Sequence, residues 1–366
     1  MGRSRASPYN GRRQGQPCLS WVNFLESHPL QFAGSHILSV QQFERGDVEH
    51  IFAVADRMVP YAHRRRVTRV LDGAILGSMF FEPSTRTRVS FGSAFNLLGG
   101  EVRETTGFEN SAIAKGESLY DTARVLSGYS DVIVMRHPAT GSVAEFAAAS
   151  RVPVINGGDG SNEHPSQALL DLYTIRSELT ARGRSIDRLR IAMVGDLRYG
   201  RTVHSLSKLL CLFTGVQVVL VSPQELRMPG EIVQEMREAG LQVLESDALE
   251  AGISSVDIVY STRIQEERFS SLAEADLYRG RYRLNQSIYT HHCEPNTVIM
   301  HPLPRDSRDN ARELDDDLND NPNLAIFRQT DNGMLVRMAL FALTLDVVDQ
   351  VDRHARDVNW YTAGRF

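Results

Sequence analysis

The sequence predicts an α/β protein of two domains, each a parallel sheet flanked by helices. Short apolar runs, typical of buried strands, alternate with stretches of helical spacing, and this alternation favours parallel sheets covered on both faces. The length of 366 residues corresponds to roughly two domains of about 150 residues each. Polar clusters follow directly after six of the expected strands. Because ligands of open parallel sheets bind at the carboxyl ends of strands, we expect one site in the cleft between the domains.

The expected elements follow one another in regular order from about residue 36. Strands are expected at residues 74–81, 131–135, 152–155, 190–194, 216–221, 257–260 and 297–300. Helices are expected between them at residues 87–98, 117–129, 165–178, 202–213 and 231–239. A last helix, at about 333–352, is too apolar to stand alone and should pack back on the body of the protein.

We place the first domain at residues 36–167, completed by the last helix, and the second at 168–332. Residues 1–35 form an N-terminal extension that we expect to be disordered. Its first 17 residues carry four arginines and no acid, among many Gly, Pro, Ser and Gln residues. A transit peptide has a similar composition, but no amphipathic helix is evident.

The composition excludes several classes of protein. With 42% apolar and 23% charged residues, the chain is ordinarily globular rather than disordered. Its net charge of −5 argues against general nucleic-acid binding, and no apolar run approaches the roughly 18–20 residues that cross a membrane. Three scattered cysteines indicate neither a disulfide framework nor a structural zinc site. We therefore expect a protein of the reducing cytoplasm.

The basic residues are almost all arginines. Of 40 cationic side chains only two are lysines, Lys115 and Lys208. Coding-sequence composition explains the bias itself and leaves these two exceptions. For Lys208 we expect an ordinary position on a helix surface.

The cluster Ser84-Thr85-Arg86-Thr87 lies between a strand and a helix. Ser84 is a good N-cap candidate, and the free N–H groups and positive end of the helix suit an anion. Hydroxyls and a guanidinium converging there suit a phosphate better than a carboxylate. The alternative is a plain serine cap with surface arginines. The string lacks the GxxxxGK pattern of a Walker loop.

A second group of polar residues can hold a polarised carbonyl. Arg136 stands at the end of an apolar strand, and a Gly-rich turn opens the helix that begins near Pro165. His164 and Gln167 lie on one face of its first turn, where the positive helix end favours neutral histidine. His164 can then hydrogen-bond a carbonyl, while Gln167 offers an amide acceptor to an NH₂ group. The alternatives are a surface arginine and a capping arrangement.

The remaining clusters suit carboxylates and an amide. Arg201 and Arg263 are candidates for clamping carboxylates, against the alternative of exposed surface arginines. The prolines of His301-Pro302-Leu303-Pro304 remove backbone donors and leave carbonyls free to accept, and a cis peptide before Pro304 is compatible with this loop. Adjacent His291-His292-Cys293 suits loop packing better than a metal, so we expect no metal site. No catalytic triad or nucleophile elbow is present, so we expect no covalent intermediate.

Together these clusters resemble the aspartate/ornithine carbamoyltransferase family over about residues 36–350. The signature is residues 80–91, Phe-Phe-Glu-Pro-Ser-Thr-Arg-Thr-Arg-Val-Ser-Phe. The other matching segments are Lys115–Ser118, Val134–Pro138, Gly158–Gly160, His164–Gln167, Gly195–His204, Thr262–Arg268 and His301–Pro304. Ornithine-specific members carry His-Cys-Leu-Pro and Asp-x-Trp-x-Ser-Met-Gly segments, whereas this chain resembles the aspartate-specific members. One departure is Gly92, where the family commonly has Glu, which puts local helix stability or subunit contacts in doubt.

The resemblance implies transfer of a carbamoyl group from carbamoyl phosphate to the amine of L-aspartate, the committed step of de novo pyrimidine synthesis, without a cofactor. It assigns Ser84, Thr85, Arg86 and Thr87 to the phosphate, and Thr87, Arg136 and His164 to the carbonyl oxygen. It assigns Gln167 and the Leu303 and Pro304 backbone to the NH₂ group. It assigns Arg201, Arg263 and Gln265 to the aspartate carboxylates, and it pairs Glu82 with Arg268 when the domains close.

The resemblance also implies a homotrimer with shared sites, because Ser111 and Lys115 match a loop that enters the neighbouring subunit's site. It leaves open larger assemblies with regulatory chains or another pyrimidine-pathway enzyme. Two alternative functions are carbamoyl transfer to another amine, such as ornithine, and a non-catalytic homologue that acts as an assembly partner.

Lys115 gives a first testable prediction. A compact ammonium on a flexible stem can touch both a phosphate and a carboxylate, which a planar guanidinium fits less well. We expect Lys115→Arg, a change in keeping with the chain's own bias, to lower turnover by about tenfold or more, the worth of one charge-assisted hydrogen bond. Steady-state assay of the variant checks this. Normal turnover would leave the lysine without a specific role.

Overall fold

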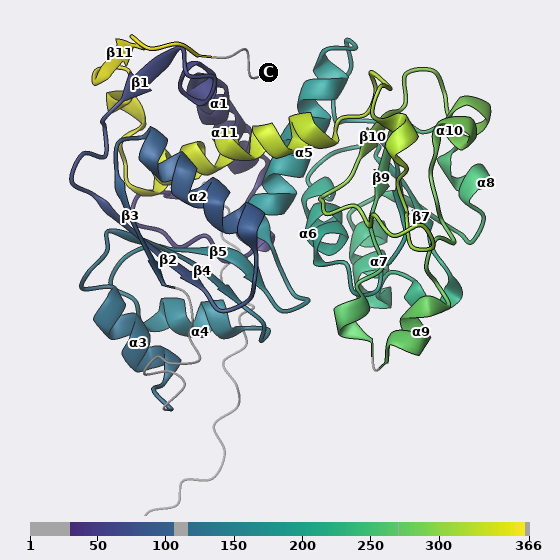
Figure 1. The fold of residues 1–366 in the computed structure, drawn as a ribbon, viewed down its shortest axis with the longest axis horizontal. Helices are drawn as coiled ribbons and strands as arrows, with labels where there is room; N and C mark the ends of the chain where they lie inside the picture. Colours follow the sequence, from purple (N-terminus) through teal and green to yellow (C-terminus); the bar gives the residue numbers. More distant parts are fainter. Residues whose placement is uncertain (1–29, 106–115, 270, 363–366) are drawn as a thin grey trace, which may run out of the picture.

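Two parallel sheets form the framework of the chain in the computed structural model, which describes residues 30–105, 116–269 and 271–362 (Figure 1). The first sheet has the order β3-β2-β4-β5, with β2 (Ile75–Phe80), β3 (Glu101–Thr105), β4 (Val132–His137) and β5 (Val154–Asp159). The second has the order β10-β9-β6-β7-β8, with β6 (Arg190–Val194), β7 (Gln217–Val221), β8 (Gln242–Ser246), β9 (Ile258–Ser261) and β10 (Val298–Met300). All neighbouring strands in both sheets are parallel. The predicted fold class is confirmed.

Helices cover both faces of the first sheet, because its strands are apolar on both sides. Val132 and Val134 of β4 face one core, whereas Ile133 and Met135 face another, as the two-residue period of a strand requires. Figure 1 shows one layer above the sheet, made by α1 (Arg45–Ala62), α2 (Thr85–Leu97) and α11 (Ile326–Thr344). The opposite layer is made by α3 (Leu119–Leu126) and α4 (Ser142–Ala149).

The second sheet is covered in the same way. Ile191 and Met193 of β6 belong to the larger core, and Ala192 and Val194 to a separate one. The larger core includes residues of α5 (Pro165–Thr180), α6 (Arg201–Leu210) and α7 (Gly230–Glu238). The separate core includes residues of α8 (Leu249–Ile253) and α10 (Gln286–His292). The short helix α9 (Leu272–Asp276) follows β9, and β1 (Arg66–Thr68) pairs antiparallel with β11 (Ala355–Asp357).

Helices α5 and α11 join the two halves, because one continuous core contains residues of both helices and of both sheets. The helix expected at 333–352 is α11, which both begins and ends earlier, at Ile326 and Thr344, and packs against α1, α2 and α5. The boundary expected between residues 167 and 168 falls in the first turn of α5. The exact division of the chain into domains stays a prediction.

Several elements carry no clear signal in the sequence. Strands β3 and β8 are half-exposed edge strands with no apolar run, and α1 contains Pro60 in its last turn. The Gly-rich turn expected after residue 155 is wrong in part, because β5 continues through Gly157 and Gly158 to Asp159. Glycines suit this position, since Gly158 has φ +117° and two arginine side chains lie against it.

Gly195, which follows β6, gives a prediction of stability. Its φ is +116°, and a Cβ there would lie 2.2 Å from the Thr262 carbonyl oxygen, which follows β9. Gly195→Ala would force these two strand ends apart, so we expect a loss of about 1–3 kcal/mol in the free energy of unfolding. Urea denaturation measures this difference.

Gly92 provides the matched control. It lies inside α2, and a Cβ there would have only ordinary contacts at 3.8 Å. Gly92→Ala should therefore raise the free energy of unfolding by about 0.5–1 kcal/mol, because alanine favours helix interiors. An equal effect of the two substitutions would contradict the close approach at Gly195.

Candidate active site

A cavity of about 400 Å³ lies between the two sheets, at the carboxyl ends of their strands. Its walls come from the segments after β2, β5, β6, β9 and β10, together with β4 and α11. The expectation of one site between the domains is confirmed. The residues predicted from the sequence that line it are Glu82, Ser84, Thr85, Arg86, Thr87, Arg136, His164, Gln167, Arg201, Arg263, Gln265, Arg268, Leu303 and Pro304. Ser111 and Lys115 lie outside the described residues.

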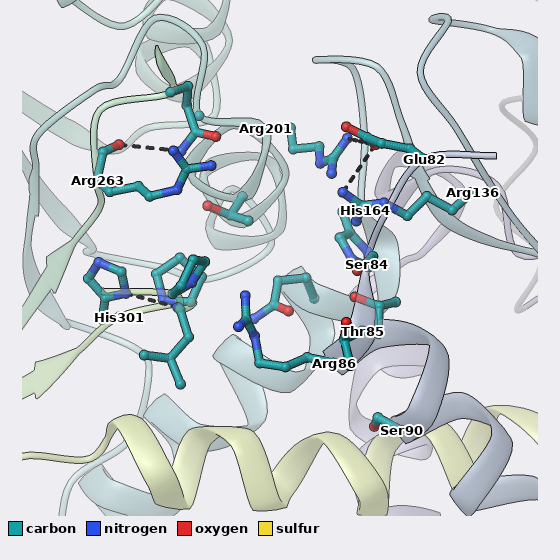
Figure 2. Close-up of a pocket in the computed structure, with 18 of the residues that line it drawn as sticks. Glu82, Ser84, Thr85, Arg86, Ser90, Arg136, His164, Arg201, Arg263 and His301 are labelled. Carbon is teal, nitrogen blue, oxygen red and sulfur yellow. Dashed lines mark hydrogen bonds and ion pairs between the residues drawn. The ribbon is translucent and has the colours of Figure 1, made fainter. Parts of the chain in front are cut away.

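Positive charge dominates this cavity. Its lining includes six arginines, whereas Glu82 is its one carboxylate among the residues described. Figure 2 shows Arg86 on one side and Arg263 facing it across the cavity. Such a surplus favours ligands that carry several negative charges.

Three of the arginines surround Glu82. Its Oε2 lies 3.1 Å from Arg136 Nη2 and 3.7 Å from Arg201 Nη1, and its Oε1 lies 3.7 Å from Arg268 Nη2 (Figure 2). Arg201 and Arg268 also donate to the carbonyl oxygen of Gly160. Burial and the neighbouring Arg201 lower the pKa of Arg136 to about 10. Glu82 thus holds together cations that come from both domains.

The start of α2 leaves its donors free. Ser84 is the N-cap residue, as predicted, but its side chain makes no capping hydrogen bond. Arg86 forms no ion pair with any residue of the described chain, and burial and the nearby charge of Arg263 lower its pKa. A plain serine cap would use the Ser84 hydroxyl. The observed arrangement instead offers a hydroxyl, a guanidinium and helix N–H groups to an anion.

His164 is buried and neutral at the start of α5. It is the N-cap of that helix, and Pro165 is the first helical residue, as predicted. Burial, and then Arg201 and Arg136, lower the pKa of His164 well below 6.5. The expected neutral form is therefore favoured, chiefly by loss of solvent rather than by the helix end. A neutral imidazole can donate one hydrogen bond without adding charge.

Gln167 of α5 and residues 301–304, which follow β10, both line the cavity. The Gln167 amide nitrogen donates to Asp171 Oδ1 at 2.9 Å, which leaves its oxygen as an acceptor. The Leu303–Pro304 peptide is cis, in agreement with the expectation for this loop. The Leu303 N–H donates to His301 Nδ1 at 2.8 Å. A ligand NH₂ group would thus find one acceptor in the Gln167 oxygen and others in the backbone carbonyls of this loop.

The segment after β9 carries the second group of cations. Arg263 Nη1 donates to the Ile264 carbonyl at 2.9 Å, and Gln265 Nε2 donates to the Arg263 carbonyl at 3.3 Å. Glu266 braces this segment by a two-pronged pair with Arg279, with N–O distances of 2.6 and 2.8 Å. Pairing with Arg279 lowers the pKa of Glu266 to about 2. The segment is therefore held in place from behind.

Three residues of α11 also line the cavity and were not predicted from the sequence: Gln329, Thr330 and Arg337. Arg337 is buried, donates to Ser90 Oγ at 2.8 Å and lies over the Phe91 ring at 4.9 Å. Burial lowers its pKa to about 10. Arg337 is a charged residue within the apolar run Met334–Leu345, and that contrast could have marked it.

Lys208 corrects another expectation. It does not lie on an open helix surface, because its Nζ is 3.0 Å from Glu163 Oε1 and its side chain is only 17% exposed. Among the residues described, no group of His, Cys, Asp and Glu could hold a metal ion. No helix within the described ranges is long and apolar enough to cross a membrane.

The buried state of His164 makes a prediction about stability against pH. Because its pKa is lowered in the folded protein, the unfolded chain binds the extra proton below pH 6.5. The free energy of unfolding should therefore fall as the pH drops, by about 1 kcal/mol between pH 7.5 and 5.5 from this residue alone. Urea denaturation of the wild type and of His164→Gln isolates the effect, because the other histidines are present in both. An equal loss in the two proteins would contradict it.

Comparisons with known proteins agree with this arrangement. Residues 35–177 match the family model for the carbamoyl-P binding domain of aspartate/ornithine carbamoyltransferases, and residues 187–344 match the model for their Asp/Orn binding domain. The aspartate carbamoyltransferase catalytic subunit of Saccharophagus degradans is 76% identical over 92% of this chain and 100% of its own length. That of Cellvibrio japonicus is 73% identical over 92% of this chain and 99% of its own.

A solved structure has the same fold. Aspartate transcarbamoylase from Trypanosoma cruzi, in complex with carbamoyl phosphate and aspartate, superimposes with a TM-score of 0.79. It is 37% identical, and the match covers 87% of this chain and 99% of that one. The chain described here belongs to the aspartate/ornithine carbamoyltransferase family.

Proposed function

We propose that this protein transfers the carbamoyl group of carbamoyl phosphate to the amine of L-aspartate, giving N-carbamoyl-L-aspartate and phosphate. The observation that carries the proposal is a cavity lined by six arginines and one carboxylate, with a neutral histidine and amide acceptors beside them. The Trypanosoma cruzi relative was solved with both of these substrates. The relatives from Saccharophagus and Cellvibrio bear the name of this activity.

The phosphate of the donor belongs at the start of α2. Ser84, Thr85, Arg86 and Thr87 line the cavity there. Within the described residues the Ser84 side chain makes no capping hydrogen bond and Arg86 forms no ion pair, and the helix N-terminus favours negative charge. This arrangement also stabilises the leaving group, because phosphate departs with more negative charge than it carried in the acyl phosphate.

The carbonyl oxygen belongs beside Thr87, Arg136 and His164, which all line the cavity. As the amine attacks, charge develops on this oxygen. Preorganised donors aimed at such an oxygen lower the activation barrier by about 2.7–4 kcal/mol each. The carbamoyl NH₂ group would donate to the Gln167 oxygen and to the Leu303 and Pro304 backbone.

The acceptor side favours aspartate over ornithine. Arg201, Arg263 and Gln265 offer cations and an amide, which suit the two carboxylates of aspartate. An ornithine side chain would bring an ammonium group among these arginines. Glu82 offers no compensation, because three arginines already surround it.

The reaction we propose is a direct attack. The aspartate amine forms the new C–N bond, the C–O bond to phosphate breaks, and the amine proton leaves with the phosphate. Holding both substrates between the domains brings the reacting groups together and excludes water from a hydrolysable donor. The contact of Glu82 with Arg268 supports the proposal that this pair holds the domains closed.

A shared site between subunits completes the proposal. By family resemblance, Ser111 and Lys115 would enter the site of the neighbouring subunit in a homotrimer. Larger assemblies with regulatory chains or another enzyme of pyrimidine synthesis remain compatible with it. The free thiols of Cys211 and Cys293 suit the cytoplasm, where we place the enzyme.

An assay of the purified chain tests the function directly. With carbamoyl phosphate present, we expect carbamoylaspartate to form with aspartate and no product with ornithine. Arg86→Ala should lower turnover by roughly 10²–10³-fold, because it removes a cation that stabilises the departing phosphate.

The variant Arg237→Ala serves as a matched control, because this arginine forms a surface pair with Glu245 far from the cavity lining. It should keep normal turnover. Product formation with ornithine would support the other acceptor, and loss of carbamoyl phosphate binding in calorimetry would support a non-catalytic homologue. Near-normal turnover of Arg86→Ala would overturn its assigned role.

A further inference from the structure

A buried carboxylate lies behind the cavity, outside its lining. Asp171 is on α5, one turn after Gln167, and is fully buried. It forms no ion pair with any residue in the described part of the chain. A buried carboxyl group is costly unless its oxygens are hydrogen-bonded, and Asp171 accepts three hydrogen bonds from side chains. The reaction steps proposed above do not use it.

The three hydrogen bonds are divided unequally between the two oxygens. Gln167 Nε2 and Gln329 Nε2 both donate to Oδ1, at 2.9 and 2.6 Å. The Tyr260 hydroxyl alone donates to Oδ2, at 2.6 Å. The two amide groups can only donate through nitrogen, whereas a hydroxyl can both donate and accept. Asp171 Oδ1 thus accepts from the two amides, whereas Oδ2 is bonded to the hydroxyl, which can either donate or accept.

This division fixes the polarity of Gln167. An amide side chain has nearly the same shape when its oxygen and nitrogen are exchanged, so shape alone does not orient it. Asp171 Oδ1 accepts and cannot donate, which selects the orientation with the nitrogen toward Asp171. The Gln167 oxygen then remains for the cavity, where an incoming NH₂ group needs an acceptor. With the amide reversed, the Gln167 NH₂ group would face the NH₂ group of the ligand, and neither could accept a hydrogen bond.

Gln329 is oriented by Asp171 in the same way, and it links Asp171 to the segment after β10. Its nitrogen is held by Asp171, and its oxygen accepts from the His301 N–H at 3.0 Å. His301 begins the loop that ends at Leu303 and Pro304, whose backbone carbonyls accept from the same NH₂ group in the proposed function. One carboxylate therefore orients acceptors that come from α5 and from the segment after β10.

Resting on the proposed function, we propose that Asp171 is a positioning residue that sets the donor–acceptor polarity of the carbamoyl NH₂ site through Gln167 and Gln329. Its role is that of an oriented acceptor, not of a charge. Tyr260 supports the carboxylate without setting the polarity of either amide.

The protonated carboxyl group satisfies the same pattern. Burial raises the pKa of Asp171 to about 7, and the nearby charge of Arg337 acts in the opposite direction. A proton on Oδ2 would donate to the Tyr260 hydroxyl, which can turn to accept it. Oδ1 would remain the acceptor of both amides, so both protonation states keep Gln167 in the same orientation.

Substitutions at Asp171 separate the acceptor from the charge. Asp171→Leu has similar bulk but no acceptor, and we expect kcat for carbamoylaspartate formation to fall by about tenfold or more. Asp171→Asn lacks the charge but can place its oxygen toward the amides and its nitrogen toward Tyr260. It should recover most of the kcat that Asp171→Leu loses. Binding of inorganic phosphate, measured by calorimetry, should change by less than about twofold in both variants, because no hydrogen bond within the described residues joins Asp171 to Ser84, Thr85, Arg86 or Thr87.

Tyr260→Phe is the control for stability. It removes a buried hydrogen bond from the same carboxylate but leaves both amides in place. It should lower the urea midpoint, with a much smaller effect on kcat than Asp171→Leu. Equal losses of kcat in these two variants would show a merely structural role.

The remaining outcomes are equally decisive. If Asp171→Asn is as inactive as Asp171→Leu, the charge of the carboxylate matters and the inference is wrong. If Asp171→Leu does not fold, the kcat of Asp171→Asn relative to the wild type decides the question alone. Loss of phosphate binding in Asp171→Asn would also overturn it. Wild-type protein that makes no carbamoylaspartate would instead refute the proposed function, whereas an active wild type with fully active variants would refute only the role of Asp171.

Discussion

The mutual repulsion of arginines held in one cavity is the constraint on which this site depends. Six guanidinium groups line a space of about 400 Å³, and burial lowers the pKa of both Arg136 and Arg337 to about 10. Glu82 offsets part of the charge for three of them. Arg337 relies on one hydroxyl and an aromatic face. The positive charge that remains destabilises the folded protein as long as no anion is bound. Two anionic substrates relieve it, so the same repulsion that opposes folding favours binding.

The fold tolerates this repulsion because the cations stand on elements that share one core. Arg136 is at the end of β4 and Arg201 at the start of α6, and the core that includes α5 and α11 contains residues of both sheets. Glycine makes the approach possible, because at Gly158 any side chain would meet both of these arginines at 3.3 Å. The arginines are thus held in place by the apolar core that anchors their strands and helices. Rigid placement lets the donors act on a substrate without first reorganising.

The sequence predicted the parts of this arrangement that have local signals. Buried strands such as β4 and β6 are apolar on both faces, and Pro165 marks the start of α5. Edge strands β3 and β8 were missed, because half-exposed strands need no apolar run. Gln329, Arg337 and Asp171 were missed for another reason. Each is a buried polar residue of a helix. Its importance comes from partners that are far away in the sequence, up to 247 positions for Arg337 and Ser90. The surface position expected for Lys208 failed in the same way, since its partner Glu163 lies on another element.

The buried groups also explain why the proton of the attacking amine should leave with the substrate. His164 is a weak base, because its pKa is well below 6.5. His301 Nδ1 accepts the Leu303 N–H, and its Nε2 is enclosed 2.8 Å from Glu313 Oε1, so neither nitrogen is turned to the cavity. Glu82 is surrounded by guanidinium groups, and Asp171 lies behind the lining, bonded to three donors. No titratable group of the described cavity is therefore both free and basic. In the proposed reaction the departing phosphate gains negative charge as the C–O bond breaks, and it lies next to the attacking amine, so it can take the amine proton.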